Sequence, residues 1–276
     1  MGRNSKYYKH SGSVGLWGPA CIVLVGLIGT SVLGVAYGFA IHWIPSIYLS
    51  FFIVLGYAIG VGAVVAFAGY LGKVRNMPLL FTSGILIGLF AIYIGWVSWI
   101  FANPIADFII YRPDQVWSVI KSISIHGAWS IWGWTPKGFV LYAIWGLEAL
   151  LILSGTLLIP WTIIGFMPFC EFCKKWIRNT VSLKSLQYID DPEKLKSNLE
   201  DGDFSKLNEL KQADESVSHT RAELVFCPTC KKEFFLTIIS VEIKEEDNGK
   251  TDEQEEDIVR NLIVSKETFE KMKALC

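Results

Sequence analysis

The sequence predicts a mainly α membrane protein, in which a bundle of four transmembrane helices is followed by a small α+β domain in water. Three observations predict this fold class. The first 170 residues hold four long apolar runs, whereas 23 of the 26 Asp and Glu residues lie at or beyond Glu171. Four of the six cysteines form two C-x-x-C pairs, both in the acidic part. The chain is therefore divided into an amino-terminal segment (1–17), a membrane domain (18–168) and a cysteine-containing domain (169–276).

Each of the four apolar runs is long enough to cross a bilayer, because a helix rises about 1.5 Å per residue and the hydrocarbon core is about 30 Å thick. The expected spans are residues 18–41, 46–71, 79–101 and 138–164. The first run is too long for the core of a signal peptide and has no evident small-residue cleavage site, so it is expected to persist as a span.

The loop between the third and fourth spans, residues 103–137, is more polar and rich in aromatic residues. Within it, Val116, Trp117, Ile120 and Ile123 recur at helical spacing. This pattern predicts a short helix within residues 113–123 that lies in the membrane interface.

Basic residues near the span ends predict the orientation, because Lys and Arg are retained on the cytoplasmic side. Three precede the first span, two lie between the second and third spans, and three closely follow the fourth. The opposite side has Arg112, Lys121 and Lys137, spread over the long loop. Both termini are therefore expected in the cytoplasm, where a reducing environment keeps cysteines as thiols or metal ligands.

Glycines recur four residues apart inside three of the spans. The pairs are Gly34 with Gly38, Gly56 with Gly60, and Gly84 with Gly88. Such spacing lets helix backbones approach closely in lipid. We expect these glycines to pack the bundle within one chain, and contacts in a homo-oligomer are the alternative.

Glu148 lies about ten residues into the fourth span, where a carboxylate costs about 2.5 to 3.5 kcal/mol on insertion scales. It is therefore a candidate functional residue. Either it is protonated or hydrogen-bonded to Tyr, Ser, Thr or Trp groups of other spans and serves assembly, or it relays a proton or lines a polar path. A relay needs more polar neighbours than the Ser and Thr residues of the other spans provide.

The two C-x-x-C pairs, Cys170 with Cys173 and Cys227 with Cys230, predict one metal site, because four thiolates complete a tetrahedral shell for zinc. Each pair is preceded by Phe and followed by Lys-Lys, and the second pair leads into a strand, as in a zinc ribbon. The 53 residues between the pairs predict a helical insertion at about 180–220. A full set of four sulfurs indicates a structural zinc-ribbon-like site; a thiol redox pair and unmetallated cysteines are the alternatives.

The remaining elements of the C-terminal domain follow from caps and apolar alternation. Asp190 or Asp191 before Pro192 starts a helix, and Phe204 to Leu210 suggests a second. A strand is expected from Phe234 to Ile243 with a bulge near Ser240, an acidic turn containing Asn248-Gly249, a strand from Ile258 to Val264, and a last helix capped by Ser265.

Several function classes find no support in the sequence. An acidic tail without a basic stripe disfavours nucleic-acid binding. The chain has no G-x-S-x-G, no H-E-x-x-H and no phosphate-binding glycine loop. Four spans with C-x-x-C pairs are similar to membrane thiol oxidoreductases such as the vitamin K epoxide reductase family, but both pairs here fall in the tail.

The pattern Trp145-x-x-Glu148, followed by Pro168-Phe169-Cys170-Glu171-x-Cys173-x-x-Trp176, resembles a group of uncharacterised bacterial four-span membrane proteins. The resemblance extends to residues 46–75 and 127–131, and covers the membrane half better than the tail. It implies a bacterial inner membrane and a cysteine-rich cytoplasmic end, and it implies no activity.

The sequence thus favours a membrane-anchored, metal-stabilised module without catalytic activity that binds a protein partner or senses a condition. The alternative is a small transporter or channel subunit that uses Glu148, with the tail as its regulator. A third hypothesis is an enzyme whose site gathers His126, Arg112 and Asp114 on the outer loop. The expected partners are the lipid bilayer and a protein.

Overall fold

The computed structural model describes residues 5–44, 47–103, 109–127, 129–130, 133–214, 216–245 and 251–274. The chain forms two compact units. One is Ser11–Phe166, and the other combines Met1–His10 with Met167–Cys276. We call them the helical unit and the sheet unit.

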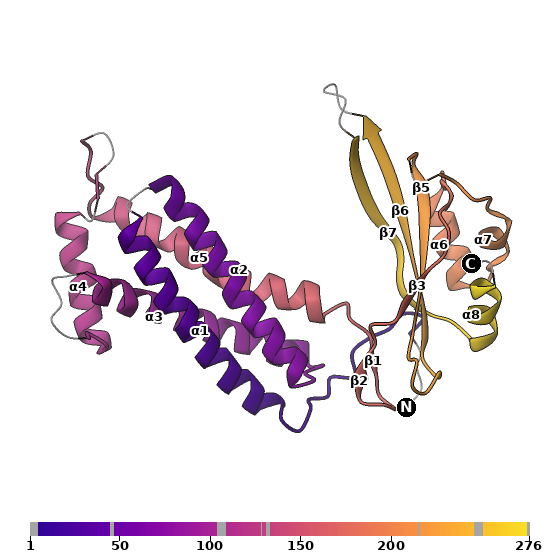
Figure 1. Cartoon of the computed structure of the whole chain (residues 1–276), viewed down its shortest axis with the longest axis horizontal. Coiled ribbons are helices and arrows are strands. Elements are labelled where there is room, and N and C mark those ends of the chain that lie inside the picture. The colour runs from indigo at the N-terminus through magenta and orange to yellow at the C-terminus, as the bar shows by residue number, and fades with distance from the viewer. Residues whose placement is uncertain are drawn as a thin grey trace. The chain divides into compact units, whose positions relative to one another are not determined.

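The helical unit contains four helices that are long and apolar enough to span a membrane (Figure 1). They are α1 (Gly18–Trp43), α2 (Ile47–Leu71), α3 (Met77–Ala102) and α5 (Phe139–Ile164). The four apolar helices expected from the sequence are thus confirmed. The third begins two residues earlier than expected, because the Asn76 side chain accepts a hydrogen bond from the Leu79 N–H and caps the helix.

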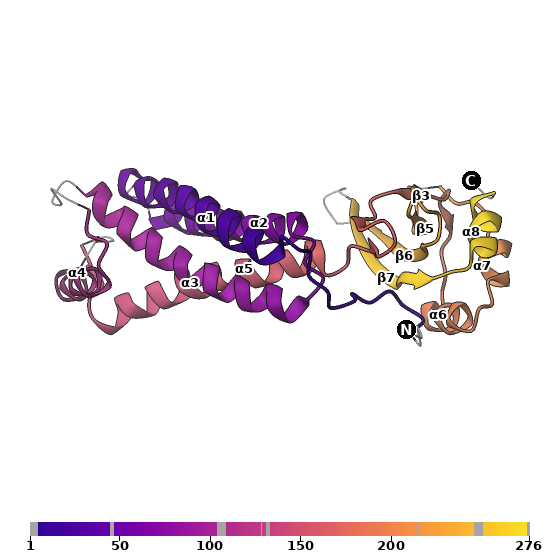
Figure 2. The ribbon, with the colours of Figure 1, turned by 90° about the horizontal axis from the view of Figure 1, so that it is seen from below.

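The helices pack so that α2 and α3 each contact both α1 and α5 (Figure 2). The shorter helix α4 (Pro113–His126) joins the bundle through its apolar face. Its buried side chains Val116 and Ile120 form a cluster with Val97 and Ile100 of α3. The short helix expected within residues 113–123 is therefore present and three residues longer.

Five of the six glycines in the predicted pairs lie against neighbouring helices. A Cβ atom at Gly34, Gly38, Gly60, Gly84 or Gly88 would meet atoms of another helix at 2.6 to 3.2 Å. Gly56 differs, because a Cβ there would meet nothing within 4 Å.

Two helices also approach closely at a pair of glycines that are not part of the predicted four-residue spacing. A Cβ at Gly62 of α2 would collide with the carbonyl oxygen of Gly155 in α5, and one at Gly155 would collide with that of Ala58. Real Cβ atoms do not tolerate such contacts, so α2 and α5 meet backbone to backbone here.

The sheet unit is built on an antiparallel sheet in the order β3-β5-β6-β7, with β4 also paired to β5. Its strands are β3 (Thr180–Ser182), β4 (Leu186–Gln187), β5 (His219–Phe226), β6 (Phe234–Glu245) and β7 (Thr251–Ile263). A separate hairpin consists of β1 (Phe169–Cys170) and β2 (Lys175–Trp176). Helices α6 (Pro192–Glu200), α7 (Ser205–Glu209) and α8 (Lys266–Lys273) complete the unit.

The two faces of the sheet have different neighbours, because successive side chains of a strand point to opposite sides. Leu224, Leu236 and Ile238 belong to the main core, together with apolar residues of α6, α7 and α8. Val225 and Phe235 alternate with them and belong to a second cluster that contains cysteines. The sheet thus separates a helix-covered core from the cysteine site.

The three predicted helices of this unit are confirmed as α6, α7 and α8, and two of them begin at the expected side-chain caps. The Asp191 side chain accepts a hydrogen bond from the Lys194 N–H, and the Ser265 side chain accepts one from the Thr268 N–H. The segment at 180–220 is only partly helical, since it also forms β3 and β4, which pair with β5. The insertion therefore extends the sheet as well as contributing helices.

The predicted hairpin is formed by β6 and β7, but its turn is shorter than expected. Residues 252–257, interpreted as an acidic turn, belong to β7 and pair with β6. Their side chains are exposed, and Glu255 forms an ion pair with Arg221, so the acidic residues remain solvated within a strand. The register irregularity lies between Leu236 and Ile239, not at Ser240. The Asn248-Gly249 signal lies outside the described residues.

The amino-terminal segment covers the C-terminal end of the free edge of β7. Tyr7 forms an antiparallel bridge with Leu262, and the Ile263 N–H donates to the Lys6 carbonyl. An open strand edge invites pairing with other chains, and this segment occupies the edge at residues 261–263. Residues 5–10 are therefore part of the sheet unit, which the sequence did not reveal.

Candidate metal centre and helix-bundle cavity

The structure brings together the four cysteines of the two C-x-x-C pairs. The Sγ atoms of Cys170, Cys173, Cys227 and Cys230 all lie within 4.8 Å of one another. Cys170 and Cys230 are 3.5 Å apart, and Cys173 and Cys227 are 3.7 Å apart. Zinc bound tetrahedrally at about 2.3 Å from each sulfur places neighbouring sulfurs about 3.8 Å apart. The four thiols therefore have the spacing needed to hold a metal ion.

Two turns of similar shape present these cysteines. Cys170 ends β1 and Cys173 lies in the turn to β2, while Cys227 and Cys230 lie in the turn between β5 and β6. The residue after each pair, Lys174 or Lys231, has a left-handed backbone with φ near +54° or +50°. This conformation reverses the chain after the second cysteine, and the repeated Cys-Lys-Lys sequence is its signal.

The cysteine cluster packs against one face of the sheet. Cys170 and Cys227 are buried, and Cys173 and Cys230 are half-buried. They form one apolar cluster with Ile177 and with the side chains of β5 and β6 that face away from the helices. Any ion held here would be shielded from water on the sheet side.

The thiols differ in acidity. Burial raises the pKa of Cys170 above the usual value for a thiol. At Cys227 burial acts in the same direction, but hydrogen bonds from the backbone N–H groups of Cys230 and Thr229 outweigh it and lower the pKa. Cys227 thus supplies the thiolate that a metal requires more readily than Cys170 does.

The amino-terminal segment supports the first turn from the other side. The Tyr8 hydroxyl accepts a hydrogen bond from the Phe169 N–H at 3.1 Å, and the Tyr8 ring packs edge-on against Phe235 with centroids 5.4 Å apart. The His10 ring approaches Trp176 at 6.1 Å. Sequence reasoning missed this support; its signal was the Tyr7-Tyr8-Lys9-His10 stretch ahead of the first span.

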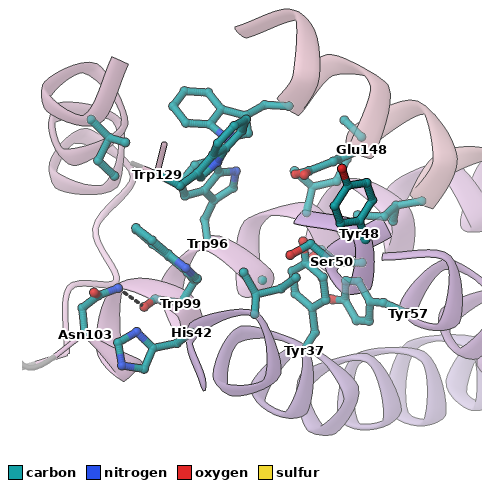
Figure 3. A pocket seen from close by; sticks show the side chains of 18 of the residues that line it. Tyr37, His42, Tyr48, Ser50, Tyr57, Trp96, Trp99, Asn103, Trp129 and Glu148 are labelled. Atoms are coloured by element: carbon teal, nitrogen blue, oxygen red, sulfur yellow. Dashed lines mark hydrogen bonds between the residues drawn. The ribbon is translucent and has the colours of Figure 1, made fainter. Parts of the chain in front are cut away.

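A second candidate site is a cavity of about 550 Å³ in the helical unit (Figure 3). Its walls come from the C-terminal halves of α1 and α3 and the N-terminal halves of α2 and α5. Aromatic side chains dominate the lining: Tyr37, Tyr48, Tyr57, Trp96, Trp99, Trp129 and Trp145. Several are fixed by one another, with Tyr37 and Tyr57 stacked at 4.4 Å and Trp96 edge-on to Trp145 at 5.0 Å.

Glu148 lines this cavity, and its carboxylate points into it (Figure 3). Within the described part of the chain, Glu148 makes no hydrogen bond or ion pair. Tyr and Ser groups of other spans were expected near Glu148, and Tyr37, Tyr48, Tyr57 and Ser50 line the same cavity. They come from two other helices, so only the packing of the bundle reveals them.

The other proposed site residues do not converge. Arg112 and Asp114 form an ion pair at the start of α4, whereas His126 ends the same helix and its Nδ1 lies 2.9 Å from the Ser122 carbonyl oxygen. The histidine nearest to Cys227 in the sequence, His219, starts β5, at the opposite end of the strand from Cys227.

No protein-family model, no curated protein and no solved structure matches this chain. Its function is therefore argued from its own residues.

Proposed function

We propose that this protein is a membrane-anchored, zinc-stabilised module that binds a protein partner or senses a condition, and that it has no catalytic activity. The observation that carries the proposal is the cluster of four cysteine sulfurs within 4.8 Å of one another. Four thiolates fill the tetrahedral shell of zinc, whereas catalytic zinc keeps a position for water or substrate. A closed shell of this kind serves folding.

The membrane placement rests on the four apolar helices and on the basic residues near their ends. We infer that both termini face the cytoplasm of a bacterium and that the helices cross its inner membrane. The resemblance of the Trp145 to Trp176 stretch to bacterial four-span proteins supports the same placement. A reducing cytoplasm keeps all four cysteines available as metal ligands.

Metal binding would stabilise the sheet unit directly. The cysteine turns join segments that are far apart in the sequence, and the apolar cluster around them is small. In small domains of this kind the free energy of metal binding is part of the free energy of folding. Loss of the metal would therefore loosen the turns and the strands that lead into them.

The test is to purify the full chain in detergent, measure its zinc content and treat it with a chelator. About one zinc per chain is expected, lost together with protection of the β5 and β6 amides from hydrogen exchange. The variant Cys21→Ser, which changes a cysteine of α1, is the matched control. Absence of bound zinc, with unchanged protection in chelator, contradicts the proposal.

The partner is sought by crosslinking in membranes, with the full chain and with the Cys170→Ser/Cys227→Ser variant. A protein captured by the full chain and lost with the variant supports an interaction that needs the folded sheet unit. Identical capture by both assigns the interaction to another part of the chain.

The cavity favours a second candidate function, a small transporter or channel subunit that uses Glu148. A carboxylate in an apolar bundle is costly and most often marks a path for an ion or a substrate. Solute flux is measured in vesicles that contain the protein or its Glu148→Gln variant. Unchanged flux in the variant removes this candidate.

A further inference from the structure

The described lining of the cavity contains an acidic side chain but no Lys or Arg. Among the described residues that line it, Glu148 is the sole carboxylate. His42 also lines the cavity, but on the side of Asn103, away from Glu148 (Figure 3). An ionised carboxylate in such surroundings is strongly destabilised unless a positive charge lies beside it. Glu148 therefore either takes up a proton or pairs with a cation, and the described residues of the lining supply no cationic side chain of Lys or Arg.

The aromatic lining has the chemistry that holds organic cations. The faces of Trp and Tyr rings attract a positive charge within about 6 Å, most strongly where water is excluded. Trp96 and Trp145 lie at 87° to each other, so the two indoles expose surfaces of different orientation. In the view of Figure 3, the Glu148 carboxylate lies between the ring of Trp96 and the ring of Tyr48.

The size of the cavity argues against a bare metal ion. A volume of about 550 Å³ lies within the range of about 300 to 1,000 Å³ that is typical of sites for small organic molecules. Hard metal cations select several oxygen ligands close together. Here one carboxylate is accompanied mainly by ring carbons, which suits a cation with apolar substituents.

The cavity also reaches the end of the bundle. His42 lies in the last turn of α1, and Asn103 follows the last residue of α3 and donates a hydrogen bond to the Trp99 carbonyl at 2.9 Å. The described residues thus place one side of the cavity among these helix ends. With both termini in the cytoplasm, this end faces the outer side.

We propose that the cavity binds an organic cation, an amine or quaternary ammonium group with apolar substituents, with Glu148 as its counter-ion and the Trp and Tyr rings as its walls. The inference deepens the second candidate function by naming the class of ligand. It does not depend on the cysteine site. The shared chemistry, a cationic nitrogen on an apolar body, could come from a free molecule or from the amine headgroup of a lipid.

The test uses the full chain in phosphatidylglycerol nanodiscs, which contain no amine lipid. Tetraphenylphosphonium serves as a permanently charged probe, and tetraphenylborate as an anion of the same shape. Binding is measured by calorimetry and by tryptophan fluorescence. Both lipophilic ions also enter lipid, and the anionic lipid favours the cation, so binding is counted above that of empty nanodiscs. We expect the phosphonium to bind above this background and the borate not to do so.

Glu148→Gln is expected to weaken phosphonium binding about 10- to 100-fold, as loss of a charged partner does. Asp114→Asn, which removes a carboxylate outside the cavity, should leave binding unchanged. Trp145→Leu should weaken it, whereas Trp161→Leu, on the same helix outside the lining, should not. Equal binding of both probes, or equal binding by Glu148→Gln, overturns the proposal.

If Glu148→Gln fails to fold, Glu148→Asp provides the second variant, which should keep the preference for the cation at lower affinity. Loss of that preference in a folded Glu148→Asp overturns the proposal. Nanodiscs with phosphatidylethanolamine distinguish the two sources of the cation. If this lipid weakens phosphonium binding by competition, the natural ligand is a lipid headgroup. If the affinity for the phosphonium is unchanged, the natural ligand is a free cation. If the phosphonium binds but the vesicles show no solute flux, the transporter function is excluded and the cation site is retained.

Discussion

The hydroxyl of Tyr8 accepts a hydrogen bond from the backbone N–H of Phe169, which lies 161 residues further along the chain. The four apolar helices lie between these two residues in the sequence. The contact therefore returns the segment before the first helix to the turn that holds Cys170. The sheet unit cannot be completed until the whole helical unit has been synthesised.

Replacing Tyr8 by Phe should destabilise the cysteine turn while keeping the ring that packs on Phe235. The hydroxyl forms hydrogen bonds with both the Phe169 N–H and the Nδ1 of His10, each at 3.1 Å; the bond to Phe169, which lies in the cysteine turn, contributes about 1 kcal/mol. We expect faster loss of zinc to a competing chelator, by a factor of about 5. Zinc transfer to a coloured chelator measures this rate.

Tyr7→Phe is the matched control, because it removes a hydroxyl of the same segment that donates to Glu200 at 2.7 Å, away from the cysteines. It should lower the stability of the sheet unit without a specific change in zinc transfer. Equal zinc transfer in both variants would show that Tyr8 contributes no more to the turn than Tyr7 does.

Acid should release the metal and loosen the sheet unit together. Protons compete with the metal for the four thiolates, so the metal-bound form has effectively depressed thiol pKa values. Its stabilisation is complete at neutral pH and is lost as the pH falls. Zinc content and tyrosine and tryptophan circular dichroism, followed from about pH 8 to about pH 4, should change with one midpoint.

A variant without the cysteine site should lose the link between zinc content and circular dichroism. In Cys170→Ser/Cys227→Ser the acid transition that follows zinc release should be absent, because there is no metal to displace. A transition at the same pH in this variant would show that other groups, such as the acidic residues of β7, cause it.

The left-handed residue after each cysteine pair leads to a third prediction. A non-glycine residue with positive φ costs about 1 kcal/mol relative to Gly, and a β-branched residue costs more. Lys231, with φ near +50°, should therefore tolerate Gly with equal or slightly higher stability, whereas Val should destabilise the turn by about 1 to 2 kcal/mol. Urea unfolding of the zinc-bound protein measures the difference.

Lys232 provides the control for this prediction. It follows Lys231 directly, has no positive φ, and places its ammonium over the ring of Phe172 at 4.9 Å. Lys232→Val should cost no more than the loss of this exposed contact. A larger loss at Lys232 than at Lys231 would contradict the role given to the backbone conformation.

Local patterns were sufficient for much of the fold. The apolar runs predicted four helices within a few residues, and Asp191 and Ser265 marked two helix starts, because span length and capping depend on neighbouring residues. The spacing of the four cysteines likewise predicted that they would meet, since thiolate pairs of this kind share an ion.

The features that sequence reasoning missed depend on contacts between distant segments. The aromatic stretch around Tyr8 does not indicate which distant segment it contacts, and Tyr37 and Tyr57 become neighbours in one cavity only when α1 and α2 pack. The acidic residues of β7 were interpreted as a turn because charge indicates solvent, and an exposed strand is solvated too. Local sequence indicates exposure here but does not indicate pairing.

The helix contact at Gly155 gives the last prediction. Gly155→Ala should destabilise the bundle by about 1 to 3 kcal/mol, because the new Cβ would collide with the Ala58 carbonyl and force α2 and α5 apart. The same substitution at Gly56 meets nothing within 4 Å, so Gly56→Ala should be neutral or slightly stabilising through its helix propensity. Thermal unfolding in detergent compares the two. Equal unfolding temperatures would show that the backbone contact between α2 and α5 is not needed, whereas the expected difference assigns it to Gly155, a residue without a glycine four positions away.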